Sequence, residues 1–218
     1  MLLAVIFDMD GVIVDSNPYH KIAIQQFCKE HGHELSDDRL LKQVYGRTNR
    51  EWITSLFGAI PEATIVQYTE EKEELYRQLF DKDIRPVRGL VSFLNLLEKH
   101  HIPRAIGTSA PRSNVDFTLG RTATGKYFDI ILNDTFVSHS KPHPEIYLKC
   151  AAALGLPNSQ CIVIEDSLSG VQAGKAAGSK VIGITTTHTR EDLSHCDMVI
   201  DDFEGLRVED LELLVGGF

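Results

Sequence analysis

The chain opens with a run of apolar residues, 2–7, that leads directly into an acidic turn. An unbroken apolar run bounded by a turn signal is typical of a strand buried on both faces of a sheet. From residue 85 onward, short apolar runs alternate with amphipathic stretches. We expect further strands over 102–107, 129–132, 161–165, 180–185 and 198–200, and helices over 90–100, 112–119, 144–154 and 170–177. This alternation predicts a parallel sheet with helices on both faces.

Residues 16–83 follow a different pattern. They are polar and charged, and their apolar positions recur three and four residues apart, which is typical of helices with one buried face. We expect helices over 19–31, 37–44, 50–57 and 63–80. The pattern therefore predicts an all-helical domain, residues 16–83, inserted into an α/β core formed by residues 1–15 and 84–218.

Composition narrows the class of protein. The formal net charge of −9 argues against general binding to nucleic acid or an anionic membrane, both of which need a basic face. The four cysteines form no Cys-x-x-Cys pair, so we expect small buried side chains in a reducing compartment. No basic segment precedes the first apolar run, and no stretch of about 18 apolar residues occurs. We expect a soluble cytoplasmic protein.

Candidate chemistry begins where the first strand ends, at Asp8-Met9-Asp10-Gly11. Ligands of open parallel sheets bind in the crevice outside the carboxyl ends of the strands. Two carboxylates in that place can hold a hard cation, or one can act as a nucleophile while the other moves a proton. Gly11 lets the backbone turn sharply and approach a ligand. The alternative is a strand that ends in an Asx turn.

Three later stretches place reactive groups at the ends of predicted strands or in a loop between them. Thr108-Ser109 precedes a helix and suits a phosphate oxygen, although a helix cap explains the same residues. Lys141 stands in a loop with two prolines, where it can neutralise a phosphate or point into solvent. Glu165-Asp166 ends another strand, where the two acids can bind a metal ion or cap the helix that follows.

The order of these four stretches along the chain resembles the haloacid dehalogenase superfamily. The resemblance is to the branch whose helical cap is inserted after the first motif, with sugar-phosphate phosphatases and β-phosphoglucomutase as the nearest relatives. It covers essentially the whole chain, and Asp8-Met9-Asp10-Gly11-Val12 carries most of it. The resemblance implies an α/β fold with a Rossmann-like parallel-sheet core and an all-helical cap domain.

The resemblance also implies catalytic roles. Asp8 is the expected nucleophile, which forms an aspartyl phosphate, and Asp10 the acid that protonates the leaving oxygen and then activates water. Thr108 holds the transferring phosphoryl group, and Lys141 neutralises charge beside it. Mg²⁺ is the implied cofactor, held by the Asp8 carboxylate, the Asp10 carbonyl and Asp166, with Glu165 nearby or joined through water. Physical chemistry agrees, because an ionised carboxylate needs charge neutralisation to approach an anionic phosphoryl group.

The same resemblance implies that the cap and the loops beside the catalytic residues select the substrate. The expected substrate-binding residues are Gly11, His20, Lys42, Gly46, Arg47, Asn49, Ser109 and Ala110. Gly46 is a candidate hinge, and Arg47 a candidate clamp for a second polar group. For Lys42 and Arg50 a solvated helix face is the alternative. The other histidines have no metal-ligand spacing, so we expect them on the surface or in the core.

One departure from the family bears on the reaction. The mutase carries a Ser-Lys pair after its hydroxyl motif to grip a second phosphate, whereas this chain has Ala110-Pro111 followed by Arg112. We therefore expect a Mg²⁺-dependent phosphatase for a small phosphorylated metabolite, a sugar or polyol phosphate, acting as a monomer without nucleic-acid or membrane partners. The alternatives are a hexose-phosphate mutase, a phosphatase for pyrophosphate or phosphoglycolate, and a non-catalytic binding module.

Overall fold

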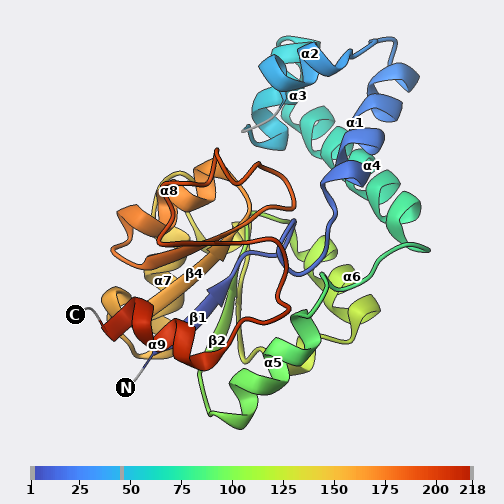
Figure 1. Ribbon diagram of the computed structural model, residues 1–218. Helices are drawn as coiled ribbons and strands as arrows, with labels where there is room; N and C mark the ends of the chain where they lie inside the picture. The colour runs from blue at the N-terminus through green and yellow to red at the C-terminus, as the bar shows by residue number, and fades with distance from the viewer. Residues whose placement is uncertain (1–2, 45–46, 217–218) are drawn as a thin grey trace. The chain divides into compact units, whose positions relative to one another are not determined.

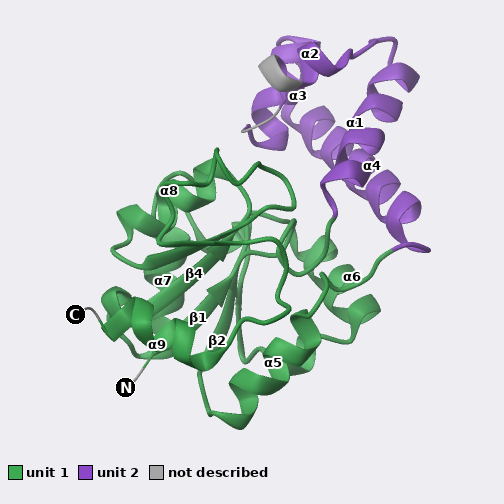
Figure 2. Cartoon of the chain, viewed as in Figure 1, with its two compact units in different colours: residues 1–15, 84–218 green, residues 16–83 purple. Residues whose placement is uncertain are grey.

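The computed structural model describes residues 3–44 and 47–216, except for the side chains of Leu41 and Lys42. The chain separates into two compact units, which are coloured differently in Figure 2. The first unit joins residues 1–15 to residues 84–218, and the second is residues 16–83. Each unit has its own hydrophobic core, and we describe each by itself.

The first unit is built on a six-stranded parallel sheet of order β3-β2-β1-β4-β5-β6 (Figure 1). Its strands are β1 (Ala4–Phe7), β2 (Arg104–Gly107), β3 (Ile130–Leu132), β4 (Cys161–Glu165), β5 (Lys180–Ile184) and β6 (Met198–Ile200). Helices lie in the connections between consecutive strands up to β5, whereas residues 185–197, which join β5 to β6, form turns. The expected α/β class, with a Rossmann-like parallel sheet, is confirmed.

Strand β1 lies between β2 and β4 inside the sheet. Every one of its side chains is apolar and buried. On one face, Ala4 and Ile6 pack in a core with residues of α7 (Glu145–Leu154) and α8 (Leu168–Ala176). On the other face, the ring of Phe7 lies 6.2 Å from that of Phe93 in α5 (Leu90–Lys99). Apolar contact on both faces is the reason why this segment reads as one continuous apolar run.

The register of the central strands sets which residues meet at their carboxyl ends. Phe7 pairs with Ile106 of β2 and with Ile164 of β4. The Asp8 amide then donates to the Ile164 carbonyl at 3.0 Å, so the β1–β4 ladder continues one residue past the strand. Asp8 is thereby fixed between the ends of β2 and β4, at the point where the connections leave the sheet in opposite directions.

The second unit consists of helices α1 (Asn17–Glu30), α2 (Asp37–Gln43), α3 (Asn49–Phe57) and α4 (Glu62–Phe80). Its core gathers apolar side chains that include Phe27 and Trp52. A reciprocal capping box between Thr48 and Glu51 fixes the start of α3. No helix among the described residues combines the length and the apolar character that crossing a membrane requires.

Several elements differ from the sequence expectation. Helix α6 (Arg112–Thr122) runs three residues further than 112–119, and α9 (Val208–Gly216) was not expected at all. In α9 Val208 and Leu211 are buried whereas Leu213 is 60% exposed, so its periodic signal spans little more than one turn. The 3₁₀ turns η1 (Gly125–Tyr127), η2 (Asp134–Phe136) and η3 (Asn158–Gln160) are too short to show any period.

Candidate active site

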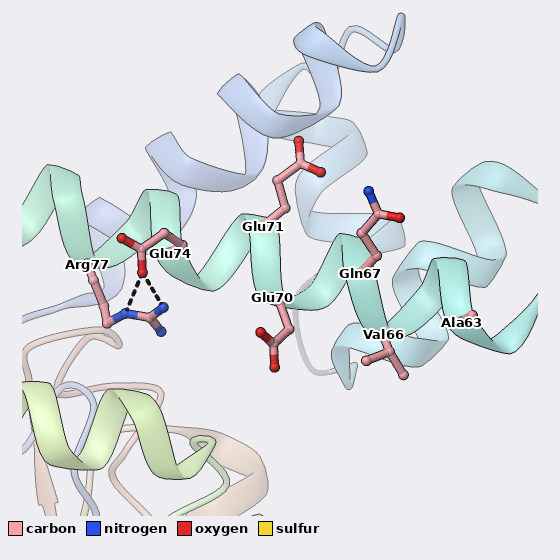
Figure 3. A pocket seen from close by; sticks show the side chains of 7 residues that line it. All are labelled: Ala63, Val66, Gln67, Glu70, Glu71, Glu74 and Arg77. Carbon is pink, nitrogen blue, oxygen red and sulfur yellow. Dashed lines mark hydrogen bonds and ion pairs between the residues drawn. The ribbon is translucent and has the colours of Figure 1, made fainter.

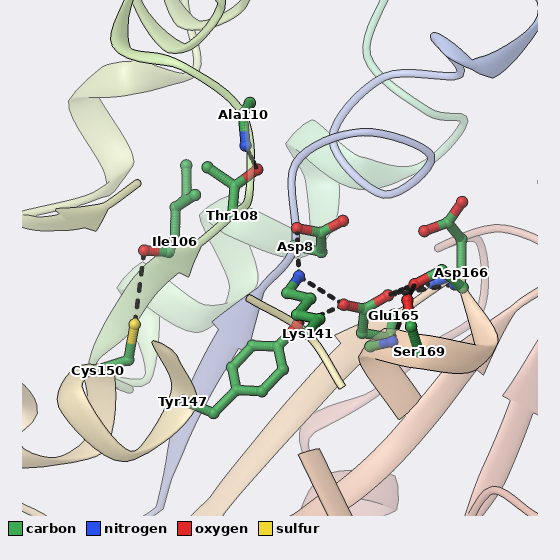
Figure 4. Close-up of polar contacts among 12 residues, drawn as sticks. Asp8, Ile106, Thr108, Ala110, Lys141, Tyr147, Cys150, Glu165, Asp166 and Ser169 are labelled. Carbon is green, nitrogen blue, oxygen red and sulfur yellow. Dashed lines mark hydrogen bonds and ion pairs between the residues drawn. The ribbon is translucent and has the colours of Figure 1, made fainter. Parts of the chain in front are cut away.

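A buried cluster of opposite charges occupies the carboxyl ends of β1 and β4 (Figure 4). The Lys141 ammonium donates to Asp8 Oδ1 at 2.8 Å and to Glu165 Oε1 at 2.6 Å. Only 7% of the Lys141 side chain is exposed, so the solvated alternative for this lysine is wrong. A lysine buried between two carboxylates is positioned by charge as well as by packing.

Glu165 is held through both of its carboxylate oxygens. The Tyr147 hydroxyl donates to Oε1 at 2.5 Å, beside Lys141. Oε2 accepts from the amides of Asp166 and Ser167, at 3.1 and 3.2 Å, and from the Ser167 hydroxyl at 3.0 Å. Ser167 is also the N-cap of α8, because its hydroxyl accepts from the Gly170 amide. The proposal that Glu165 or Asp166 caps this helix is therefore wrong.

The loop after β5 fixes two further groups at this edge of the sheet. The Thr187 hydroxyl donates to Asp166 Oδ2, and the Thr186 hydroxyl donates to the Gly11 carbonyl at 2.5 Å. Asp166 is buried, with 2% of its surface exposed. Nothing in the sequence singled out this pair of threonines, since they follow an ordinary strand at a distance of 20 residues from the acidic pair.

The cluster carries more negative charge than its single lysine can balance. Burial raises the pKa of Asp8 to about 7, with added contributions from Glu165 and Asp10, and Lys141 offsets only part of this effect. Burial, followed by the charges of Glu165 and Asp8, also raises the pKa of Asp166 well above its usual range. Burial lowers the pKa of Lys141, but the two carboxylates outweigh it and raise the net value. A bound cation would stabilise the charged forms of these acids.

The donor set fits a hard divalent cation. Asp8, Glu165 and Asp166 each offer an oxygen, and these oxygens lie within 4.8 Å of one another. Three carboxylates without nitrogen or sulfur are the ligand type of Mg²⁺ rather than of a softer metal. Because both oxygens of Glu165 already accept hydrogen bonds, Asp8 and Asp166 are the better direct ligands.

Thr108 lies at the end of β2, and in Figure 4 it stands on the opposite side of Asp8 from Asp166. It is buried, and its hydroxyl accepts from the Ala110 amide at 3.1 Å. Ser109 is exposed and Ala110 is buried. The N-cap of α6 is Pro111, without a side-chain cap, so the alternative that Thr108 or Ser109 caps this helix is wrong.

The turn after β1 presents the second acid. Asp10 is half-buried and close enough to Asp8 to raise its pKa. Gly11 has a φ of +74°, a left-handed conformation that glycine adopts without strain, and its amide donates to the Val14 carbonyl at 2.7 Å. The structure thus places Asp8, Thr108, Lys141, Glu165 and Asp166 around the ends of three adjacent strands, with Asp10 in the turn that follows β1.

The expected substrate residues of the helical unit have a different setting. The His20 ring stacks on Tyr76 at a centroid distance of 3.7 Å, and Asn49 Nδ2 donates to Glu73 Oε1 at 2.7 Å. Glu73 also accepts from Lys72 at 2.5 Å, in a buried ion pair that the sequence did not reveal. Arg47 is exposed. Gly46 and the Lys42 side chain, both expected to bind substrate, lie outside the described residues.

Figure 3 shows a pocket along one face of α4. Its lining is Ala63, Val66, Gln67, Glu70, Glu71, Glu74 and Arg77. The one cationic residue of this lining, Arg77, is already bound to Glu74. An acidic lining of this kind repels a phosphorylated ligand, so we do not assign the substrate to it.

His139 and His143 are both exposed, as expected for histidines on the surface. His139 and His143 lie together with Glu145, and each of the three offers a ligand atom within 4.8 Å of the others. Two prolines interrupt this segment, so the sequence lacks the helical pattern that usually signals such a group.

Gly170 leaves room for the Glu165 carboxylate. A Cβ atom at this position would fall 1.8 Å from Glu165 Oε1 and 2.3 Å from Oε2. We expect Gly170→Ala to displace this carboxylate and to lower turnover of p-nitrophenyl phosphate about 10- to 100-fold. Gly120→Ala is the matched control, because a Cβ there meets nothing within 4 Å. Equal activity of the two variants would show that the position of Glu165 does not matter.

Tyr147 is expected to position Glu165 and Lys141 through its hydroxyl and its ring, over which the Lys141 ammonium lies at 4.9 Å. Tyr147→Phe removes a hydrogen bond to a charged group, which costs about 1.5–3 kcal/mol of unfolding free energy. It should also lower kcat. Tyr127→Phe removes a hydrogen bond of similar length, 2.7 Å to the neutral amide of Asn95, and should leave kcat unchanged. Thermal unfolding and steady-state rates of both variants separate a positioning role from a purely structural one.

Comparison with known proteins identifies related hydrolases. The model of the haloacid dehalogenase-like hydrolase family matches residues 5–184. A phosphorylated carbohydrates phosphatase of Thermotoga maritima is 31% identical over 183 residues, which are 83% of this chain and 84% of that protein.

Two solved structures are similar over nearly the whole chain. A family IA, variant 3 HAD hydrolase from Entamoeba histolytica is 33% identical with a TM-score of 0.91, covering 99% of this chain and 100% of that one. β-Phosphoglucomutase from Clostridium difficile is 27% identical with a TM-score of 0.85, covering 99% and 98%.

The fold is a parallel α/β sheet with acidic residues at its strand ends. The chain belongs to the haloacid dehalogenase-like hydrolase family, in the branch similar to β-phosphoglucomutase and the carbohydrate phosphatases. It is an enzyme of the phosphatase type.

Proposed function

We propose that the enzyme is a Mg²⁺-dependent phosphatase that hydrolyses a sugar or polyol phosphate through a phosphorylated Asp8. The observation that carries the proposal is the buried contact of Lys141 with both Asp8 and Glu165, next to Asp166. Phosphoryl transfer is mostly positioning and charge stabilisation, and this cluster supplies both.

Asp8 attacks the phosphorus with one carboxylate oxygen, and the bond between phosphorus and the leaving oxygen breaks. Asp10, in its protonated form, gives its proton to that leaving oxygen, so an alcohol departs. Asp10 then takes a proton from water as the water oxygen attacks the phosphorus. The aspartyl bond breaks, which releases inorganic phosphate and restores both carboxyl groups.

The remaining residues hold charge in place. Mg²⁺ bound by Asp8, Asp166 and the Asp10 carbonyl would supply electrostatic stabilisation of the phosphoryl oxygens. Lys141 keeps a fixed positive charge beside Asp8, and Glu165 with Tyr147 holds that lysine in position. Thr108 binds a phosphoryl oxygen with its hydroxyl. Each role is assigned to a group that already has its orientation fixed by a hydrogen bond or by burial.

Residues 16–83 are assigned the role of a cap domain that selects the leaving group. The proposed contacts are His20, Lys42, Gly46, Arg47 and Asn49, with Gly11, Ser109 and Ala110 from the first unit. The relative from Thermotoga maritima, a phosphorylated carbohydrates phosphatase, supports a sugar or polyol as the leaving group.

The alternative reaction is that of a hexose-phosphate mutase, which the similarity to β-phosphoglucomutase favours. A mutase must hold a bisphosphate intermediate, and Ala110-Pro111 offers no charge for its second phosphate. Hydrolysis of pyrophosphate or phosphoglycolate uses the same catalytic residues, and the substrate panel below distinguishes all of these reactions.

The test is phosphate release from sugar phosphates, polyol phosphates, phosphoglycolate and pyrophosphate, with Mg²⁺ and with chelator. β-Glucose 1-phosphate is included with its bisphosphate primer, and glucose 6-phosphate is measured in parallel. We expect Mg²⁺-dependent release from one or a few sugar or polyol phosphates. Glucose 6-phosphate formed without phosphate release would establish the mutase instead, and release that is unaffected by chelator would refute the assigned cofactor.

Asp10→Asn tests the acid/base assignment. An alkoxide is a poor leaving group that needs a proton, whereas p-nitrophenolate is a good one that does not. The variant should lose about 10²- to 10⁴-fold of its activity toward a sugar phosphate. It should lose much less in phosphorylation of Asp8 by p-nitrophenyl phosphate, measured as a nitrophenolate burst. Equal losses for both substrates would assign Asp10 a structural role.

A further inference from the structure

A second group of metal-type ligands lies in the segment that carries Lys141. His139, His143 and Glu145 each present a ligand atom within 4.8 Å of the other two. The two imidazole rings lie 4.6 Å apart between centroids, with an angle of 33° between their planes. His139 Nδ1 lies 3.2 Å from Glu145 Oε2. These side chains are distinct from Asp8, Glu165 and Asp166.

The chemistry of this group differs from that of the strand-end carboxylates. Two imidazoles and one carboxylate are ligands that Zn²⁺, Ni²⁺, Co²⁺ and Cu²⁺ prefer, whereas Mg²⁺ prefers oxygen alone. Three protein ligands leave a position for water, which is the usual arrangement when a site stays open to solvent. The His139 side chain is 66% exposed, so an ion can reach the group from solution.

Glu145 links this group to the backbone around Lys141. Its Oε2 accepts from the amides of Ser138 and His139 at 3.1 and 3.0 Å, and its Oε1 accepts from Lys149 at 2.7 Å. The carboxylate is therefore held in place before any ion arrives. The same oxygen that faces His139 also fixes the start of the segment, so an ion that draws on Oε2 competes with these amide bonds.

We propose that His139, His143 and Glu145 form an inhibitory site for a divalent transition-metal ion of the Zn²⁺ type. Lys141 lies two residues from each histidine, and its ammonium must remain on Asp8 and Glu165 for catalysis. Ligation pulls both histidines and Glu145 Oε2 toward one point. The intervening backbone then shifts, and Lys141 moves with it.

The binding test titrates Zn²⁺ into the whole enzyme by calorimetry, with Mg²⁺ in excess to occupy the carboxylates at the strand ends. We expect one Zn²⁺ per chain. The variant His139→Gln/His143→Gln should bind it about 10-fold more weakly or worse. The matched control His100→Gln/His195→Gln also removes two exposed imidazoles of the same unit and should bind as the parent does. Equal Zn²⁺ affinity in all three proteins, or no binding at all, overturns the site.

The activity test follows phosphate release at saturating Mg²⁺ as Zn²⁺ is added. The parent and the control variant should lose kcat over the range in which calorimetry shows binding, and the double-histidine variant should resist. Co²⁺ provides an independent readout, because its visible spectrum changes when imidazole becomes a ligand. Binding at these histidines without loss of kcat would refute the inhibitory role, and equal inhibition of all three proteins would place the inhibiting ion elsewhere. If the enzyme shows no phosphatase activity, the proposed function fails, but the calorimetric test of Zn²⁺ binding remains valid.

Discussion

Asp8→Asn is expected to lower phosphate release by about four orders of magnitude or more, the size of loss seen when an enzyme loses its nucleophile. The amide oxygen of asparagine still accepts from Lys141, but an amide is a far weaker nucleophile than a carboxylate and forms no stable acyl phosphate. Substrate binding should persist, because the other groups around the phosphoryl site are unchanged. Steady-state release and calorimetric binding of the best substrate of the panel measure the two effects separately.

The fold should survive this substitution. Asp8 is buried and shares Lys141 with Glu165, so a neutral side chain relieves repulsion among the carboxylates. We expect thermal stability equal to that of the parent enzyme or higher. Asp129→Asn, which removes an exposed carboxylate of the same unit, is the matched control and should keep full activity.

Labelling tests the intermediate directly. After a brief reaction with ³²P-labelled substrate and an acid quench, the parent chain should retain label that hydroxylamine removes, as expected of an acyl phosphate. Asp8→Asn should retain none. Retained label in that variant, or residual turnover within ten-fold of the parent enzyme, would assign the nucleophile to another residue.

Much of the fold was predictable because the apolar sequence of β1 indicates that the strand is buried on both faces. A strand with apolar contacts on both faces needs an unbroken apolar run, and Ala4–Phe7 has one. Once a parallel order is inferred, the residues that follow each strand must meet at one edge of the sheet. The position of Asp8 beside Thr108 and Glu165 follows from this rule and from the register.

The sequence was less informative wherever a residue acts through partners that are distant along the chain. Lys141 in a loop with two prolines resembles a solvated lysine, and only the fold shows it buried against Asp8 and Glu165. Tyr147 sits at an ordinary apolar position of α7, and its hydroxyl acquires a role only because β4 ends beside it. Burial and long-range contact are tertiary properties that local periodicity does not encode.

Lys72 and Glu73 show the same limit within the helical unit. Adjacent residues on a helix normally point in different directions, so a neighbouring Lys-Glu pair resembles an exposed surface. Here both side chains are buried, and their charged ends are 2.5 Å apart. Helix α4 packs against α1 and α3, and the spacing of its apolar residues does not reveal that these two charged side chains are buried.

Glu73→Gln is expected to destabilise the helical unit by about 3–5 kcal/mol, because it leaves the buried Lys72 ammonium without its anionic partner. The single tryptophan of the chain, Trp52, belongs to this unit and reports its unfolding in urea by fluorescence. Trp52 donates to Asn49, which in turn donates to Glu73, so the probe lies close to the change. Glu74→Gln alters an ion pair whose glutamate side chain is 54% exposed, and it should cost no more than about 1 kcal/mol.

A double-mutant cycle separates the ion pair from the loss of packing. Lys72→Met alone leaves Glu73 buried without its cation, and Lys72→Met/Glu73→Gln removes both charges. We expect the double variant to be more stable than the sum of the two single losses implies, because each single variant strands one buried charge. Additive losses would mean that the two charges are independent, in spite of their 2.5 Å contact.

The pH dependence of stability tests whether the charge of Glu73 causes the loss of stability in Glu73→Gln. Burial alone would raise the pKa of Glu73, but Lys72, His20 and the hydrogen bond from Asn49 outweigh it and lower the pKa from 4.5 to about 2. A lowered pKa contributes stability that is fully present above about pH 4.5 and is lost as the pH falls toward 2. Protonated glutamic acid resembles glutamine in charge, so the stability difference between the parent and Glu73→Gln should narrow over that interval. A difference that stays constant with pH would show that shape, rather than charge, makes Glu73 stabilising.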